Sequence, residues 1–192
     1  MIDDEPDNSI RPVVAYSGTG DVYLAVWQDS LESAPTSIFA RFVDAAGNPL
    51  GTRFLVVQER PGRVQVKVVA GGGVFFVVWR EGQDPAQASL YVQRITASFS
   101  GSPLLGSPVL VHSPVENQFN AIFNPDRNEF LLTWLDPRNS VLASYLRGEV
   151  YGRIITPEGL LNPEVDFTPV PANPSITQIL NAPAYQSDLS AA

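Results

Sequence analysis

The sequence predicts an all-β fold of the β-propeller type, with three four-stranded antiparallel blades and the start of a fourth. Three observations predict it. An apolar run that ends in tryptophan, with an acid two residues later, recurs three times at intervals of about 50 residues. Each repeat holds four short segments rich in β-branched and aromatic residues, separated by Gly, Pro, Asn or Asp. The tryptophan segments are apolar at nearly every position, which predicts strands covered on both faces.

The four strands of each repeat are expected in a fixed order. The first strand precedes the tryptophan segment, at 12–16, 64–69 and 119–123. The second strand carries the tryptophan, at 21–29, 73–81 and 129–136. The third has a β-branched residue four positions after an aromatic one, at 38–43, 90–95 and 150–155. A glycine turn then leads to a weaker fourth strand, at 53–57, 108–111 and 164–167.

These strands divide the chain into consecutive blades. The expected boundaries are an acidic N-terminal tail at 1–9, blades at 10–58, 62–112 and 116–170, and a partial fourth repeat or tail at 171–192. Closed propellers have about four to eight blades, so three blades predict an open arc, an excerpt of a longer propeller, or half of a ring. The apolar side faces of an open arc favour self-association or truncation over an open monomer. The alternative fold is a many-stranded sandwich of duplicated hairpins.

Composition excludes several classes of function. The 192 residues carry a formal net charge of −8 and a single lysine, Lys67, so nucleic acid is not an expected partner. No apolar run approaches the roughly 18 residues of a membrane helix, so membrane insertion is not expected either. The absence of cysteine excludes disulfides, thiolate nucleophiles and thiolate metal sites.

The repeat resembles the propeller-type repeats of bacterial and archaeal secreted and cell-surface proteins, which follow the pattern Tyr-Leu-Val-Val-Trp-x-Asp, Ile-Tyr-x-x-Arg-Val, Gly. The resemblance covers residues 12–167. It departs from the pattern at Phe39, Phe42, Glu81 and Ile154. It implies an extracellular binding or scaffolding module and a secreted or cell-surface location, although this chain begins without the basic and apolar run of a signal peptide.

The acids that follow the tryptophans are the first candidate site: Asp29, Glu81 and Asp136. They could line one face and bind a cation or sugar hydroxyls. They could equally accept hydrogen bonds from backbone N–H groups in the turns, and their repetition favours this structural role. The arginines of the third strands (Arg41, Arg94 and Arg153) are expected to bridge neighbouring blades or to cover apolar surface with their stems.

The second candidate is an insertion at 137–148, which interrupts the period of the third repeat. Its Tyr145 lies between Arg138 and Arg147, and insertions in repeat proteins map to loops on one face. With Asp29 and Asp136, these residues make up the predicted binding set. His112, the only histidine, is expected in an exposed loop and cannot by itself define a metal site or a catalytic triad.

The predicted function is a non-catalytic propeller module that binds a protein or a glycan through its loop face. No catalytic residue, metal site or cofactor is expected, so the chain is not predicted to be an enzyme. One alternative is an excerpt of a glycosidase-like propeller hydrolase whose catalytic residues lie outside this chain. The other is a structural module that assembles with copies of itself, for example as a homodimer.

Overall fold

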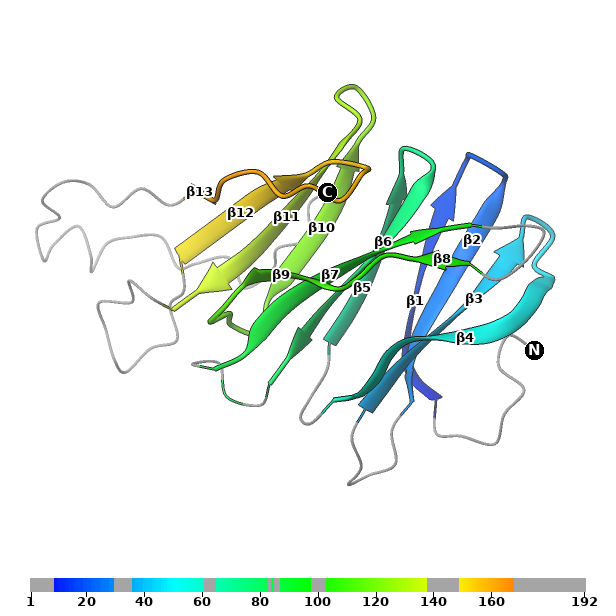
Figure 1. The fold of residues 1–192 in the computed structure, drawn as a ribbon, viewed down its shortest axis with the longest axis horizontal. Helices are drawn as coiled ribbons and strands as arrows, with labels where there is room; N and C mark the ends of the chain where they lie inside the picture. The colour runs from blue at the N-terminus through cyan, green and yellow to red at the C-terminus, as the bar shows by residue number, and fades with distance from the viewer. Residues whose placement is uncertain are drawn as a thin grey trace, which may run out of the picture.

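The structure is a computed structural model, and it describes residues 9–29, 36–60, 65–82, 84, 87–97, 103–137 and 149–167. These residues form thirteen strands and no helix, arranged in three antiparallel sheets. Figure 1 shows the three sheets side by side in one row, which does not close into a ring or a barrel within the described ranges. The prediction of an all-β chain with one sheet per repeat is confirmed. Among these residues, no helix has the length and apolar character needed to cross a membrane.

Each sheet contains the strands of one repeat. Sheet 1 consists of β1 (Ser9–Ser17), β2 (Val22–Asp29), β3 (Thr36–Asp44) and β4 (Pro49–Arg60). Sheet 2 consists of β5 (Gln65–Gly71), β6 (Val74–Glu81), β7 (Ser89–Thr96), β8 (Leu104–Leu105) and β9 (Val109–His112). Sheet 3 consists of β10 (Phe119–Asn124), β11 (Glu129–Asp136), β12 (Glu149–Ile155) and β13 (Val165–Asp166). Consecutive strands pair in chain order, as a meander.

Sheet 2 differs from the expected four strands, because both β8 and β9 pair with β7. The chain reaches the edge of β7 at β8, leaves it, and returns at β9. At the break, the Gly106 N–H donates to the Arg94 carbonyl, and the Gln93 side chain donates to the Gly106 carbonyl. Pro108 follows two residues later and has no N–H for the ladder. The fourth strand of this repeat is therefore interrupted.

The same pair of faces meets at both contacts between neighbouring sheets. In each sheet, alternate residues of the second strand point to opposite sides, and we call the side that carries the tryptophan the Trp face and the other the opposite face. The Trp face of sheet 2 (Phe75, Val77, Trp79) packs on the opposite face of sheet 1 (Val22, Leu24, Val26). The Trp face of sheet 3 (Phe130, Leu132, Trp134) packs on the opposite face of sheet 2 (Val74, Phe76, Val78). The same contact is thus made twice.

The first strands of the sheets lie next to one another, since β5 contacts both β1 and β10. The β5–β6 hairpin turns through Gly72 and Gly73, both with positive φ, as a two-residue turn requires. A Cβ atom on Gly72 would lie 2.7 Å from Oδ1 of Asn128, in the equivalent hairpin of sheet 3. This glycine therefore permits close approach of the two sheets as well as the turn.

Burial on both faces, expected for all three tryptophan strands, is found in the middle sheet and along residues 24–28 of β2. Every residue of β6 from Val74 to Arg80 is buried. The prediction is wrong for β11, where buried and half-buried residues alternate. Sheet 3 lies at the end of the row, and within the described part of the chain only its Trp face contacts another sheet. The tryptophans themselves are all buried, with exposed fractions of 4% or less.

Candidate functional site

The most polar part of the interior lies between sheets 2 and 3, at the end of the tryptophan strands. Arg80, Glu116 and Asp136 are all buried there. Asp136 is the last residue of β11 and lies two positions after Trp134, so strand alternation places both side chains on the Trp face. The segment that follows β9 docks on this strand end: Glu116 N donates to the Leu135 carbonyl, and Leu135 N donates to the Gln118 carbonyl.

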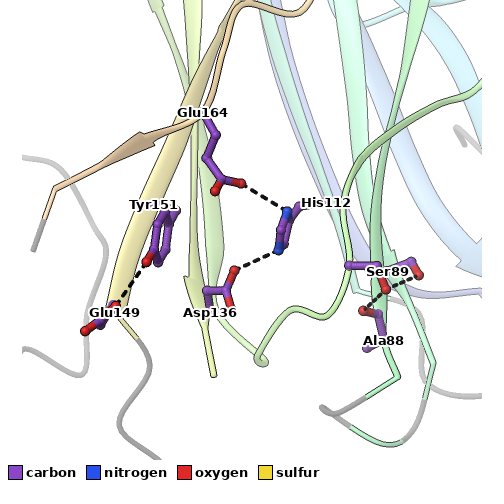
Figure 2. Close-up of polar contacts among 8 residues, drawn as sticks. Ala88, Ser89, His112, Asp136, Glu149, Tyr151 and Glu164 are labelled. Carbon is purple, nitrogen blue, oxygen red and sulfur yellow. Dashed lines mark hydrogen bonds and ion pairs between the residues drawn. The ribbon is translucent and has the colours of Figure 1, made fainter. Parts of the chain in front are cut away.

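His112 joins the two sheets in this region (Figure 2). Its Nε2 lies 2.7 Å from Oδ2 of Asp136, and its Nδ1 lies 3.0 Å from Oε2 of Glu164. The imidazole also stacks on Trp134, with ring centroids 5.3 Å apart. A neutral imidazole has only one N–H, so it can donate to both ionised carboxylates only when it is protonated. In that state, His112 of sheet 2 makes two charge-assisted hydrogen bonds to sheet 3.

The buried arginine is held by backbone carbonyls. Arg80 Nη1 donates to the Gly82 carbonyl at 2.7 Å, and Nε donates to the Val115 carbonyl at 3.4 Å. Burial lowers the pKa of Arg80, while the charges of Glu116 and Asp84 oppose that shift. Burial raises the pKa of Glu116; Arg80 opposes the shift, and the Asp136 carboxylate adds to it. The cluster therefore holds charges of both signs away from water.

The structure corrects the interpretation of His112 and separates the acids that follow the tryptophans. His112 is the last residue of β9 and only 14% of its side chain is exposed, so its prediction as an exposed loop residue is wrong. Asp136 contacts His112, whereas Asp29 pairs with Arg53 at 3.3 Å. Glu81 accepts a hydrogen bond from the indole N–H of its own repeat. The three acids thus lie at different sheet surfaces with different partners.

The predicted binding set is only partly described. Asp29 lies on the Trp face of sheet 1 and Asp136 lies between sheets 2 and 3, so the structure does not bring these two together. Arg138, Tyr145 and Arg147 lie outside the described residues. Arg80 is not among the predicted site residues, although an arginine directly after the tryptophan of a continuously apolar strand is a visible signal. Glu164 is not among them either, because no local pattern connects it to His112.

One of the three arginines predicted to bridge neighbouring sheets does so. Arg94 of β7 donates from Nε to the Pro157 carbonyl, 2.6 Å away in the turn after β12. Arg41 instead donates to the Gly51 carbonyl of its own sheet. The Nε of Arg153 is buried with no hydrogen-bond partner among the described atoms. The bridging prediction is therefore confirmed at Arg94.

The geometry of the cluster limits its chemistry. Both ring nitrogens of His112 contact carboxylates, and Ser89, shown beside it in Figure 2, shares a hydrogen bond with Ser113. Asp136 has no exposed area, so its carboxylate cannot reach a substrate as an acid or a nucleophile. No group of three metal-ligating side chains is found within the described ranges. What the cluster does is join two sheets.

No protein-family model and no curated protein matches the chain.

Proposed function

We propose that the chain is a run of three propeller-type blades that acts as a non-catalytic binding module of a secreted or cell-surface protein. The observation that carries this proposal is the repeated contact of a Trp face with the opposite face of the preceding sheet. Propeller blades are four-stranded sheets that stack in this way, with their first strands next to one another. A two-layer sandwich requires a covered inner face only, whereas β6 is buried on both sides.

The polar residues support a binding role over catalysis. The buried charges are used between the sheets, where His112 contacts Asp136 and Glu164. A glycosidase needs two carboxyl groups that flank a substrate, and Asp136 has no access to one. The charges of this cluster therefore contribute to the rigidity of the module, and its ligand binds elsewhere.

The proposed ligand is a protein or a glycan that binds at the loop end of the sheets. Strands β2, β6 and β11 all end on the same side of the row, opposite the hairpin turns that precede them (Figure 1). Asp29 and Asp136 mark this end, and the insertion with Arg138, Tyr145 and Arg147 follows β11 there in the sequence. Aromatic and arginine side chains are the residues most enriched at binding hot spots.

Binding to a glycan array and to a panel of extracellular proteins tests this proposal. We expect saturable binding that the triple variant Arg138→Ala, Tyr145→Ala, Arg147→Ala weakens by about 10-fold or more. The matched control is Arg127→Ala, an exposed arginine in the turn at the other end of β11. Binding that the triple variant leaves unchanged would contradict the proposed surface. Hydrolysis of a chromogenic glycoside that is lost in Glu164→Gln would contradict the non-catalytic assignment.

A further inference from the structure

The ring of His112 lies between two acids that differ in exposure. Its Nε2 contacts Asp136, which has no exposed area, and its Nδ1 contacts Glu164, whose side chain is 18% exposed (Figure 2). Asp136 belongs to β11, an inner strand of sheet 3. Glu164 belongs to the short segment that leads into β13, at the edge of the same sheet. One side of the ring therefore faces a buried group on an inner strand, and the other faces a group at the surface.

The surroundings of the ring are predominantly acidic. Two of the nearby arginines donate hydrogen bonds to backbone carbonyls, Arg80 to Gly82 and Arg94 to Pro157. Acids outnumber arginines on the elements packed around the ring, and such an environment favours a protonated imidazole. The charged groups on these elements are Asp84, Glu116, Asp136, Glu149, Glu164 and Asp166 among the acids, and Arg80, Arg94 and Arg153 among the bases.

The two contacts of His112 require two ring protons. A neutral imidazole has one N–H and one lone pair, so one of the two carboxylates would then face a lone pair instead of a donor. We expect the remaining proton to stay on Nε2. Leaving the fully buried Asp136 without this donor costs more than releasing Glu164 into water. The contact that is lost on deprotonation is therefore the contact with Glu164.

The segment that carries Glu164 has few other attachments. Strand β13 contains only residues 165–166, and both are exposed. After it, the Phe167 N–H donates to the Val150 carbonyl at 2.8 Å. The Phe167 ring lies over Gly152 of β12, where a Cβ atom would be 2.5 Å from it. An edge strand with so few hydrogen bonds and so little buried surface belongs to the least stable part of a fold, so the loss of one contact can open it.

We propose that His112 is a pH-sensitive latch that fastens β13 to sheet 2. While the ring is protonated, Glu164 is bound and β13 covers the edge of β12. When the ring loses one proton, Glu164 is released and β13 separates from β12, while the contact with Asp136 still joins sheets 2 and 3. The opening exposes backbone N–H and C=O groups of β12, which is the kind of edge to which another strand can add. This regulation does not depend on the ligand proposed above.

The direction of the pH dependence follows from the two forms of the latch. Histidine is the side chain that ordinarily changes its charge between pH 5 and 8. The closed form holds the protonated ring of His112 by two carboxylates, and the open form holds it by one, so the closed form binds the proton more tightly. Acid therefore favours closure. The stability that the latch contributes is lost as the pH rises and the ring of the closed form is deprotonated.

Nuclear magnetic resonance on the full chain tests the latch directly, because the chain contains a single histidine. Long-range ¹H–¹⁵N spectra should show both ring nitrogens protonated in acid, and a proton on Nε2 alone in alkaline solution. Across the same titration, the protection of the Phe167 amide against hydrogen exchange should fall by about fivefold, the upper limit for a partly exposed ion pair. Protection is corrected for the intrinsic pH dependence of exchange. The amides of β3, in sheet 1, should keep their protection.

Glu164→Gln removes the charge that the latch uses. We expect it to weaken proton binding at His112 by about threefold and to make the protection of the Phe167 amide independent of pH. Glu158→Gln is the matched control, since Glu158 is an exposed acid in the turn after β12, and it should change neither quantity. A ring with one N–H in acid, an alkaline form protonated on Nδ1, or wild-type Phe167 protection that does not change with pH would overturn the inference. Ligand binding is measured separately, so each of these results leaves the proposed function in place.

Discussion

Replacing His112 with alanine tests the account of the contact between sheets 2 and 3. The substitution removes the imidazole that lies 2.7 Å from Asp136 and 3.0 Å from Glu164. It also removes the stacking of that ring on Trp134. The Asp136 carboxylate then remains buried without this partner, in the region where Glu116 adds a second negative charge. We expect a large loss of stability from a single truncation.

The magnitude follows from the burial of the two acids. Breaking a buried ion pair by removing one partner costs about 3–5 kcal/mol, and Asp136 has no exposed area. Glu164 is partly exposed, so its pair with His112 contributes about 1 kcal/mol or less. Since 14% of the His112 side chain is itself exposed, we expect His112→Ala to cost about 3 kcal/mol, the lower limit of the range.

Denaturation by urea, monitored by tryptophan fluorescence, measures this loss. A double-mutant cycle with His112→Ala and Asp136→Ala isolates the pair, and we expect a coupling free energy of about 2 kcal/mol. Glu164→Gln serves as the comparison and should cost about 1 kcal/mol or less. A loss below about 1 kcal/mol for His112→Ala, or a larger effect of Glu164→Gln, would refute the reasoning.

Two further predictions concern the stacked cores and the buried acid. Trp79→Ala, in the sheet covered on both sides, should destabilise the chain by about 3–5 kcal/mol in the same assay, and a loss under about 1 kcal/mol would count against blade stacking. Burial raises the pKa of Glu116 in the folded state, so its contribution to stability is fully present below its unfolded pKa and is lost as pH rises through the folded value. Glu116→Gln should therefore become progressively more stable than wild type from acidic to neutral pH; a constant difference in unfolding free energy across that range would exclude this role.

The strands could be predicted from the sequence because their signals are local. Apolar runs that end in Trp27, Trp79 and Trp134 recur with similar flanking turns, and each became the second strand of a sheet. The alternating burial of β11 could not be predicted in the same way, because burial in an end sheet depends on what covers its outer face: Ala25 and Trp27 are buried on the outer face of sheet 1, whereas Leu131 and Leu135 are only half-buried on that of sheet 3. Five of the eight residues of β11 are apolar against six of eight in β6, but one face of β11 has no neighbouring sheet within the described chain.

The charged cluster was missed for a related physical reason. Its members come from separate strands and loops, and only the stacking of two sheets brings His112 close to Asp136. Alternation along β11 does place Asp136 on the Trp face, so the direction of its side chain could have been derived. The contact of Asp136 with His112 could not be derived from the sequence. It depends on which faces of the two sheets pack together and on how their strands are aligned. Arg80 was the one member with a local signal, because it is a charged residue at the end of an otherwise apolar run.

The most direct test of the central claim, that neighbouring sheets stack with their first strands adjacent, is a cross-link between β5 and β10. Lys67 and Asn120 are joined across these strands by a hydrogen bond of 3.2 Å, and the chain contains no cysteine. In the variant Lys67→Cys, Asn120→Cys, a short bifunctional maleimide should link the two thiols within one chain rapidly. The control pair Lys67→Cys, Arg127→Cys should react far more slowly, since Arg127 lies in the turn beyond β10. Equal rates for the two pairs, or no intramolecular product from the first, would contradict the stacked arrangement.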